Sequence, residues 1–270
     1  MDYKQKVIQA YAGGGEVDRA KKYGEYGMEF MYTKKALEPY IGKDKKVIEL
    51  GCGGGYYGMH YGPLCKEYHG VDLSPVNVSI FREQIQKAGY ENMQVHTGDA
   101  TELEQIRNDS YDVVLCLGPM YHLNREDRKK CISECYRICR INGIVAFAFI
   151  NKTGVIAKFA PVFGWDKVLT PRIDDCVLTW GTDDVHTDIF YYTMPEEIEQ
   201  DAEEIGLSKI RLTGLDFLIE DDKIGEFTEE QRRIWFHYAD LVAGSEYATA
   251  LSNHALLLCR KEEAVEKIYK

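Results

Sequence analysis

The sequence predicts an α/β protein built on a doubly wound, mostly parallel sheet, and two observations support this prediction. Between residues 45 and 150, short apolar runs alternate with stretches of helical length, which is the pattern of repeated strand–helix units. The first apolar run ends in Glu49 and breaks into four glycines within residues 51–55, which indicates a buried strand followed by a loop that passes close to a ligand. Right-handed crossovers should bring the carboxyl ends of parallel strands to one edge of the sheet.

Length and composition limit the possible classes of protein. The 270 residues can bury a proper hydrophobic core, and we expect one domain over residues 1–270. The sequence has no apolar run of 18 residues, and its first residues lack the apolar segment of a signal peptide, so we expect no membrane partner. The eight cysteines are then expected to be reduced thiols in a cytoplasmic protein.

The formal net charge of −11 is unevenly distributed along the chain. Residues 183–230 hold sixteen acids against three Lys and Arg, whereas residues 1–46 hold ten Lys and Arg against seven acids. Because binding to a nucleic-acid backbone requires a basic face, this distribution argues against a nucleic-acid partner.

The first forty residues are expected to form two helical pieces, separated by the glycines of residues 13–15. The second piece, residues 16–40, carries an aromatic strip that includes Tyr23, Tyr26 and Tyr32. This strip can pack on an edge of the sheet or close over a ligand. We therefore interpret residues 1–44 as an N-terminal helical cap.

Residues 45–150 form the predicted ligand-binding core. Apolar runs predict strands over residues 47–50, 66–73, 93–96, 111–117 and 144–150. Helices are expected to start within residues 56–68, and to cover residues 75–88 and 124–139. Ser74 is a suitable N-cap for the second of these helices, because Pro75 follows at the first helical position.

The alternation is lost over residues 151–193, where prolines, glycines and tryptophans are scattered among aromatic residues. We interpret this segment as an insertion after the fifth strand and a substrate lid. Residues 194–270 complete the sheet, with a helix that starts at Met194 and is capped by Thr193. Two further strands are expected near residues 210–212 and 255–258, with a helix over residues 228–242 between them.

The glycine-rich loop fits two different cofactor motifs. Gly53, Gly55 and Gly58 match the dinucleotide pattern GxGxxG, and Asp72 follows at about the distance (roughly 20 residues) expected for an acid that binds a ribose. An oxidoreductase that binds NAD is therefore one hypothesis.

In a second register, Glu49, Gly51, Gly53 and Gly55 give the pattern ExGxGxG. This pattern resembles the first motif of the class I S-adenosylmethionine-dependent methyltransferases, which have a Rossmann-like fold. A carboxylate at the end of the first strand would repel a pyrophosphate, but it suits a ligand that carries an ammonium and a sulfonium group. The electrostatics therefore favour the methyltransferase hypothesis.

Three further segments extend the resemblance, each of them after a predicted strand. They are residues 70–74 (GVDLS), residues 98–100 (GDA) and residues 117–123 (LGPMYHL). The resemblance covers residues 45–150 motif by motif and residues 194–260 by the order of elements. It implies a sheet of seven strands with an antiparallel last strand, and S-adenosylmethionine as the cofactor.

The resemblance also implies roles for the residues of the first two motifs. The backbone at Gly51 and Gly53 should pass the amino-acid part of the cofactor, and Glu49 should hold its ammonium group directly or through water. Asp72 offers two carboxylate oxygens to the two ribose hydroxyls, and Leu73 belongs to the same cofactor site.

The third and fourth motifs are implied to hold the other end of the cofactor. Asp99 should accept a hydrogen bond from the adenine amine, while the Ala100 N–H donates to a ring nitrogen. The backbone of Leu117 and Gly118 should lie beneath the sulfonium, where carbonyl oxygens favour positive charge.

His122 and Tyr121 are the candidate catalytic residues. The run over residues 117–123 looks like that of bacterial small-molecule methyltransferases, and His122 has a pKa range suited to a general base. His122 can equally be a residue that only packs, because methyl transfer to an amine or a thiol can proceed by positioning alone.

Cys131, Cys135 and Cys139 fall on one stripe of a predicted helix. Three ligands on such a stripe span about 12 Å, which is too far for one zinc ion, so we interpret them as small buried residues and expect no metal site.

Taken together, the motifs predict a methyltransferase that uses S-adenosylmethionine and a small-molecule acceptor. Two alternatives remain open at this point: an NAD-binding oxidoreductase, and a non-catalytic regulatory module that binds the cofactor. Residue patterns alone give neither the acceptor nor the oligomeric state.

Overall fold

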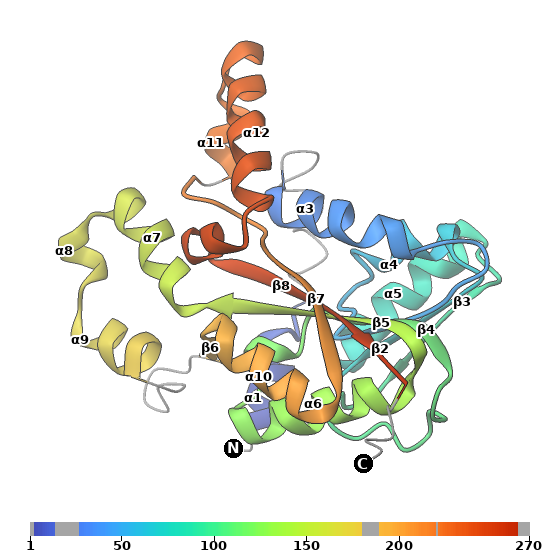
Figure 1. Cartoon of the computed structure of the whole chain (residues 1–270). Helices are drawn as coiled ribbons and strands as arrows, with labels where there is room; N and C mark the ends of the chain where they lie inside the picture. Colours follow the sequence, from blue (N-terminus) through green and yellow to red (C-terminus); the bar gives the residue numbers. More distant parts are fainter. Residues whose placement is uncertain (1–2, 14–26, 180–188, 220, 264–270) are drawn as a thin grey trace, which may run out of the picture.

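The protein is built around one central sheet (Figure 1). The structure, a computed structural model, describes residues 3–13, 27–179, 189–219 and 221–263. Its sheet has eight strands in the order β3-β2-β1-β4-β5-β8-β7, with β6 paired to β5 outside this path. The reversal of strand order on either side of β1 places a crevice at the carboxyl ends of β1 and β4.

The strands confirm the predicted sheet. Their bounds are β1 (Lys46–Leu50), β2 (Glu67–Asp72), β3 (Met93–Thr97), β4 (Tyr111–Cys116), β5 (Cys139–Asn151), β6 (Tyr192–Thr193), β7 (Leu207–Gly214) and β8 (His254–Lys261). The strands from β3 to β5 pair in parallel, whereas β8 is antiparallel to both β5 and β7, as expected for the last strand. The two-residue strand β6 has no counterpart in the prediction.

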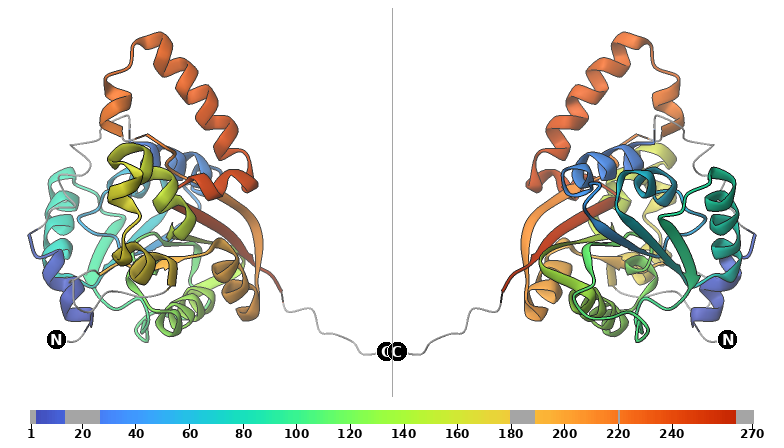
Figure 2. Two further views of the ribbon diagram at one scale, coloured as in Figure 1. Left: turned by 90° about the vertical axis from the view of Figure 1, so that its left-hand side faces the viewer. Right: turned by 90° about the vertical axis from the view of Figure 1, so that its right-hand side faces the viewer.

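Helices cover both faces of the sheet (Figure 1). Their bounds are α1 (Tyr3–Ala10), α3 (Met28–Leu37), α4 (Gly58–Tyr61), α5 (Pro75–Ala88), α6 (Arg125–Ile138), α7 (Lys152–Phe163), α8 (Trp165–Val168), α9 (Pro171–Ile173), α10 (Pro195–Ile205), α11 (Asp221–Gly225) and α12 (Glu229–Ala243). Figure 2 shows that α11 and α12 rise above the body of the molecule. None of the helices in the described ranges is long and apolar enough to cross a membrane.

Side chains that alternate along the strands fill two core layers. On β5, Ala146 and Ala148 belong to the layer covered by α3, α5 and α12, while Val145 and Phe147 belong to the layer covered by α6 and α10. A strand buried on both faces must be apolar at every position, which explains the continuous apolar run that predicted β5.

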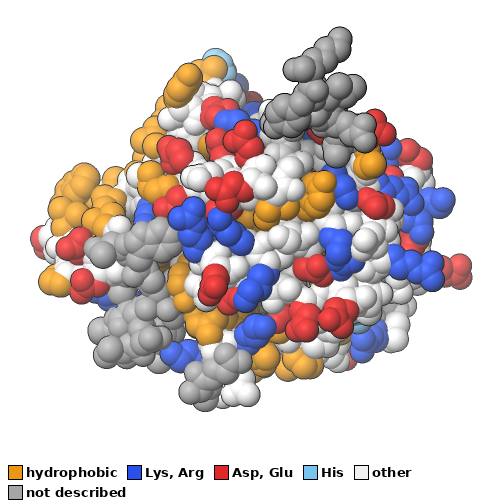
Figure 3. Space-filling view, turned by 60° about the horizontal axis from the view of Figure 1, so that its bottom comes forward, with side chains coloured by type: hydrophobic (Ala, Val, Ile, Leu, Met, Phe, Trp, Pro, Cys, Tyr) orange, Lys and Arg blue, Asp and Glu red, His pale blue; other side chains and the backbone are white. Residues whose placement is uncertain are grey.

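Ion pairs join the two helices on the lower face of the sheet. The Asp201 carboxylate on α10 forms ion pairs with Arg125 at 3.2 Å and with Lys129 at 3.3 Å, both on α6. Lys129 also pairs with Glu204 at 2.8 Å. On the face that Figure 3 shows, Lys and Arg side chains are interspersed with Asp and Glu. Some acidic residues of the C-terminal half therefore form ion pairs with basic residues of the segment 45–150.

Several predicted helices are confirmed with their caps. The Ser74 side chain accepts a hydrogen bond from the Asn77 N–H at the start of α5, and Asn124 accepts one from Asp127 at the start of α6. The helix expected after the glycine loop is much shorter than predicted, with only α4 and a 3₁₀ turn (Gly62–Leu64). Pro63 stands in this turn and has no N–H to donate, so the helix cannot continue.

The N-terminal region agrees with the prediction in part. The aromatic strip contributes to the core on α3, where Met28 and Tyr32 are buried. Tyr23 and Tyr26 lie outside the described residues.

The structure gives the insertion its elements and corrects one expectation at its end, the capping role of Thr193. The described part of residues 151–193 is largely helical, with α7, α8, α9 and a π-helical segment (Asp174–Thr179). Thr193 does not cap α10; its hydroxyl accepts a hydrogen bond from buried Arg128 at 2.7 Å, and Met194 takes the N-cap position without a side-chain bond. Residues 180–188 of the insertion lie outside the described residues.

A single buried side chain joins the end of β5 to the insertion and to β8. Asn151 is fully buried, and its oxygen accepts a hydrogen bond from the Thr153 N–H as the N-cap of α7. Its amide nitrogen donates to the carbonyls of Thr249 at 2.9 Å and Ser252 at 3.1 Å. The insertion is therefore held at the carboxyl edge of the sheet.

We expect Asn151→Ala to lower the free energy of unfolding by about 2–4 kcal/mol, because one cap is lost and two buried carbonyls lose their donor. Urea unfolding followed by circular dichroism would measure the change. Thr153→Ala is the matched control, since it keeps the Asn151 amide and removes an exposed residue's hydroxyl, which donates to Asn151 at 3.1 Å and to the Ala250 carbonyl at 3.2 Å; it should cost less than about 1 kcal/mol. Equal losses in the two variants would contradict the role of the Asn151 amide.

Candidate active site

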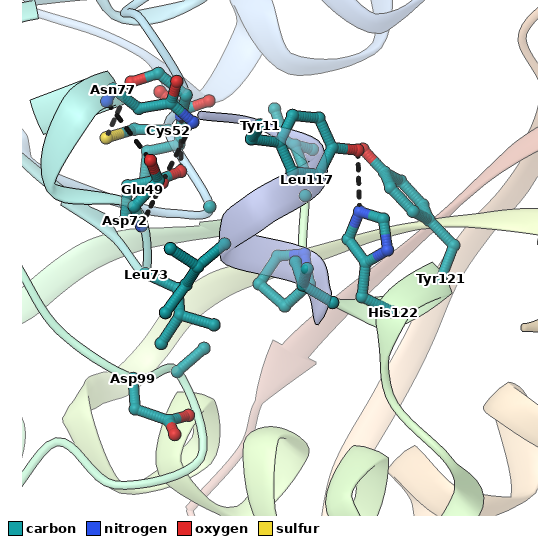
Figure 4. A pocket seen from close by; sticks show the side chains of 18 of the residues that line it. Tyr11, Glu49, Cys52, Asp72, Leu73, Asn77, Asp99, Leu117, Tyr121 and His122 are labelled. Carbon is teal, nitrogen blue, oxygen red and sulfur yellow. Dashed lines mark hydrogen bonds between the residues drawn. The ribbon is translucent and has the colours of Figure 1, made fainter. Parts of the chain in front are cut away.

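One pocket at the carboxyl edge of the sheet brings the predicted site residues together (Figure 4). Its empty space is about 1100 Å³, which includes open solvent at the mouth. The pocket is lined by all eleven candidates, namely Glu49, Gly51, Gly53, Asp72, Leu73, Asp99, Ala100, Leu117, Gly118, Tyr121 and His122. This space has room for a nucleoside cofactor and a small second ligand.

The glycine loop owes its shape to positive φ angles at Gly51, Gly53 and Gly55, where another residue would be strained. Gly51 has φ of 69° and Gly53 has φ of 52°. A Cβ on Gly51 would lie 2.7 Å from Pro119 Cδ, whereas a Cβ on Gly53 would meet no atom within 4 Å. Gly51 therefore serves packing between two loops, and Gly53 leaves the backbone open toward a ligand.

Two of the three glycines of the dinucleotide register, Gly55 and Gly58, have a packing cause. A Cβ on Gly55 would lie 2.2 Å from the ring of Phe81, and one on Gly58 would lie 2.3 Å from the same ring. The close approach of α5 to the loop requires both glycines. Their spacing therefore needs no pyrophosphate to explain it.

Asp72 is held by the loops on either side of it. Its carboxylate accepts hydrogen bonds from the N–H groups of Gly53 and Ser74, each at 2.8 Å, and from the Asn77 amide at 3.2 Å. Burial raises the pKa of Asp72, and these three donors partly oppose the shift. A carboxylate has about four acceptor positions, so a ribose hydroxyl can still be accepted.

Glu49 is a buried carboxyl, and none of the basic residues that the structure describes forms an ion pair with it. Its side chain accepts a hydrogen bond from the Tyr68 hydroxyl. Burial raises the pKa of Glu49 to about 8; the Tyr68 bond lowers it in part, and the nearby charge of Asp72 adds to the rise. A ligand that carries an ammonium group would stabilise the ionised form of Glu49.

Asp99 differs from Glu49 in that a lysine lies beside its carboxylate. Its carboxylate contacts Lys4 of α1 at 2.5 Å and accepts two hydrogen bonds from Thr101. Burial alone would raise the pKa of Asp99, but the Lys4 and Thr101 bonds hold it below its usual value. Lys4 therefore stands at the position that was expected to receive an adenine amine.

Two loops form the floor of the pocket with their backbones in contact. A Cβ on Gly118 would lie 2.6 Å from the Gly51 carbonyl oxygen, so Gly118 must be a glycine for packing as much as for ligand access. Leu117 is buried beside it.

His122 has a defined tautomer. Its Nδ1 lies 2.9 Å from the Ile189 carbonyl oxygen, which can only accept, so Nδ1 carries the proton and Nε2 carries the lone pair. Nε2 lies 2.9 Å from the Tyr11 hydroxyl, which must then donate to it (Figure 4). Burial lowers the pKa of His122 to about 4, although the bond to Ile189 opposes the shift. The imidazole is a neutral hydrogen-bond acceptor at neutral pH.

Sequence reasoning missed the part of the site that α1 provides. Tyr3, Lys4, Val7, Ile8 and Tyr11 all line the pocket. The prediction relied on the aromatic strip and considered residues 23–32. The aromatic residues Tyr3 and Tyr11, which lie closer to the N-terminus, line the site. The available signal was the spacing of Tyr3, Val7 and Tyr11, which places them on one face of a helix.

The cysteines of α6 are buried in the core, as predicted, and they lie beside a further cysteine, Cys116 of β4. The sulfurs of Cys131 and Cys135 lie within 4.8 Å of Cys116 on β4, and all three residues are fully buried in the apolar layer. A metal held by three thiolates would keep a net charge in this layer, where burial is costly. Packing accounts for the cluster.

Comparisons with known proteins agree with this geometry. Residues 47–143 match the family described as a methyltransferase domain. A ubiquinone biosynthesis O-methyltransferase of Acinetobacter baylyi is 31% identical over 176 residues, which are 64% of this chain and 67% of that protein. One from Acinetobacter baumannii is 28% identical over 173 residues, with 64% and 68% covered.

Solved structures show a similar fold. An S-adenosylmethionine-dependent methyltransferase from Mesorhizobium loti has a TM-score of 0.58 at 14% identity and covers 87% of this chain and 100% of its own. A geranyl diphosphate C-methyltransferase from Streptomyces coelicolor has a TM-score of 0.55 at 12% identity, with 86% and 78% covered.

We expect binding of S-adenosylhomocysteine to release a proton from Glu49. With a pKa of about 8, Glu49 is protonated below that pH, and a bound ammonium group favours its ionised form. Affinity should therefore rise with pH toward about 8 and then level off. Calorimetry in two buffers of different ionisation enthalpy would measure the release.

Glu49→Gln is the matched control for this experiment, because it keeps the size of the side chain and removes the titration. The variant should show no proton release and a flatter pH dependence. An unchanged release would assign the proton to another group.

Proposed function

Because this chain belongs to the class I S-adenosylmethionine-dependent methyltransferases, we propose that it methylates a hydroxyl group of a small aromatic acceptor. The observation that carries the proposal is the Nε2 lone pair of His122, which already accepts a hydrogen bond from a hydroxyl group in the pocket. The names of the relatives from Acinetobacter, which are O-methyltransferases, support the same atom class.

The residues of the glycine loop and of the strand ends fit the cofactor. Gly53 leaves open space for the amino-acid part, Glu49 provides a buried carboxyl for its ammonium group, and Asp72 keeps an acceptor position for the ribose. When bound, S-adenosylmethionine supplies a methyl group on a positively charged sulfur. Residues 98–100 would hold the adenine, with Asp99 and Ala100 both at the pocket wall.

His122 is proposed to receive the acceptor's proton. A base with a pKa of about 4 is weak toward a free phenol. The proton becomes far more acidic as the oxygen forms its new bond to carbon, since the oxygen then gives up electron density. A neutral, oriented imidazole is therefore sufficient, and its low pKa keeps it in the active form at neutral pH.

Aromatic side chains support an aromatic acceptor. The imidazole of His122 contacts the rings of Tyr121, Phe190 and Tyr11, with centroids 4.7, 5.2 and 5.4 Å away. Val7 and Ile8 add apolar surface from α1. Of these rings, Tyr11, Tyr121 and His122 line the pocket, and Phe190 packs against His122. Aromatic walls bind a flat ring by area and edge contacts, and they keep water from the reacting atoms.

The end of the insertion is proposed to act as a substrate lid. The Ile189 carbonyl accepts hydrogen bonds from the Tyr3 hydroxyl and from His122, and the Tyr191 N–H donates to the Tyr121 carbonyl at 2.8 Å. These bonds support a lid that meets α1 above the candidate base. Trp180, Asp183, Asp184 and Asp188, which were expected to belong to this lid, lie outside the described residues.

A cytoplasmic location is proposed as well. Seven cysteines are free thiols and are buried, which suits a reducing compartment; they are Cys52, Cys65, Cys116, Cys131, Cys135, Cys139 and Cys259.

We expect His122→Asn to lower kcat by about 100-fold at saturating cofactor, because the amide can keep the donor to Ile189 but has no basic nitrogen. Affinity for S-adenosylhomocysteine should change less than about twofold, since His122 stands outside the cofactor half of the pocket. Rapid assays with a panel of phenols, and calorimetry with the product, would measure both quantities.

The pH dependence provides a second readout of the same prediction. With a pKa near 4, His122 should give no break in kcat near its usual value of about 6.5. A full-rate His122→Asn enzyme, or the absence of transfer to every hydroxyl acceptor, would contradict the proposal.

A further inference from the structure

We infer that Tyr11 is a second catalytic residue, which passes the proton of the acceptor hydroxyl to His122. The inference rests on the proposed methylation of a hydroxyl group. It gives the segment after α1 a role in the reaction beyond covering the pocket.

The hydrogen bonds of His122 allow only one arrangement of protons. Nδ1 donates to the Ile189 carbonyl, so Nε2 has a single lone pair in the ring plane. The Tyr11 hydroxyl, 2.9 Å away, already donates to this lone pair. An acceptor hydroxyl therefore cannot donate to Nε2 at the same time.

The Tyr11 oxygen offers a route around this exclusion. A phenolic oxygen that donates its proton keeps lone pairs with which it can accept a hydrogen bond. Tyr11, Tyr121 and His122 all line the same pocket, so an acceptor there can reach the Tyr11 oxygen (Figure 4). The hydrogen bonds then run from the acceptor hydroxyl to the Tyr11 oxygen, and from the Tyr11 hydroxyl to His122 Nε2. Each of the three groups has a donor or acceptor role that fits its neighbour.

Tyr11 is held in this position by its backbone, by its ring and by the helix that precedes it. The Tyr11 N–H donates to the Val7 carbonyl at 3.2 Å and so extends the last turn of α1. At the other end of the helix, Lys4 contacts Asp99 and the Tyr3 hydroxyl donates to Ile189. The Tyr11 and His122 rings meet edge to face, at an angle of 77°. Because these contacts hold Tyr11 in place, its hydroxyl is better suited to relay a proton than to move aside for the acceptor.

The step is balanced in atoms and electrons. The acceptor oxygen forms a bond to the methyl carbon while the carbon–sulfur bond breaks, and the electron pair of that bond stays on the sulfur. The acceptor proton moves to the Tyr11 oxygen, and the original Tyr11 proton moves to Nε2. His122 becomes an imidazolium, and Tyr11 is again a neutral phenol.

Tyr11→Phe tests the relay with a series of para-substituted phenols, from phenol to 4-nitrophenol. Phenol must lose a proton during transfer, whereas 4-nitrophenol is largely ionised at mildly alkaline pH and has no proton to pass. We expect kcat to fall by about 10- to 100-fold with phenol and by less than about threefold with 4-nitrophenol.

Tyr3→Phe is the matched control on the same helix. It removes a hydrogen bond that holds α1 but leaves Nε2 and Tyr11 in contact. Any loss should be similar for all the phenols, because only the position of the helix changes. An equal loss across the series in Tyr11→Phe, or a faster Tyr11→Phe enzyme, would overturn the relay.

A nitrogen-15 NMR experiment separates failure of the relay from failure of the proposed function. The His122 Nε2 resonance should shift in Tyr11→Phe, and it should stay in place when phenol is added to the wild-type protein with S-adenosylhomocysteine. A shift on adding phenol would mean that the acceptor displaces Tyr11, which overturns the relay whether or not hydroxyl groups are methylated. Transfer to amines but to no phenol would overturn both the proposed function and the relay.

Discussion

The pocket depends on a contact between two loops in which neither has room for a side chain. Gly51 follows β1 and Gly118 follows β4, and a Cβ on either would lie within 3 Å of the other loop. Because β1 and β4 are neighbours at the point where the strand order reverses, these loops leave the sheet side by side. The contact joins the cofactor half of the pocket, which begins at Gly53, to the acceptor half, which contains His122.

Burial sets the charge of each polar group around this contact, and the outcome depends on whether a cation lies beside it. No basic residue in the described ranges pairs with Glu49, and burial raises its pKa to about 8. Asp99 is only partly buried, and Lys4 holds its pKa below the usual value. Beyond the pocket, burial would also raise the pKa of Asp216, yet His254 and Lys158 lower it strongly. The carboxyl group without a cation is therefore the one best suited to a cationic ligand.

The sequence predicted the features that local chemistry determines. The strand ends, the cap at Ser74, and the acids at the ends of β1 and β2 could be recognised from apolar runs and turn residues. Contacts between distant segments could not. Thr193 has good capping chemistry, but a buried Arg128 from α6 takes its hydroxyl. Tyr11 showed no local motif, and its importance comes from a histidine 111 positions away.

The candidate base is therefore a property of three segments and not of one motif. His122 comes from the loop after β4, Ile189 from the end of the insertion, and Tyr11 from the N-terminal helix. The residues proposed to hold the cofactor lie between β1 and the loop after β4 and are fixed by the sheet, whereas each partner of the base lies outside that core. Although Lys4 of α1 contacts Asp99 in the cofactor half, a change at Tyr11 or in the insertion can alter the acceptor half without disturbing the cofactor half. This separation explains why the motifs identify the cofactor clearly, while the acceptor must be inferred from the hydrogen bonds of a single imidazole.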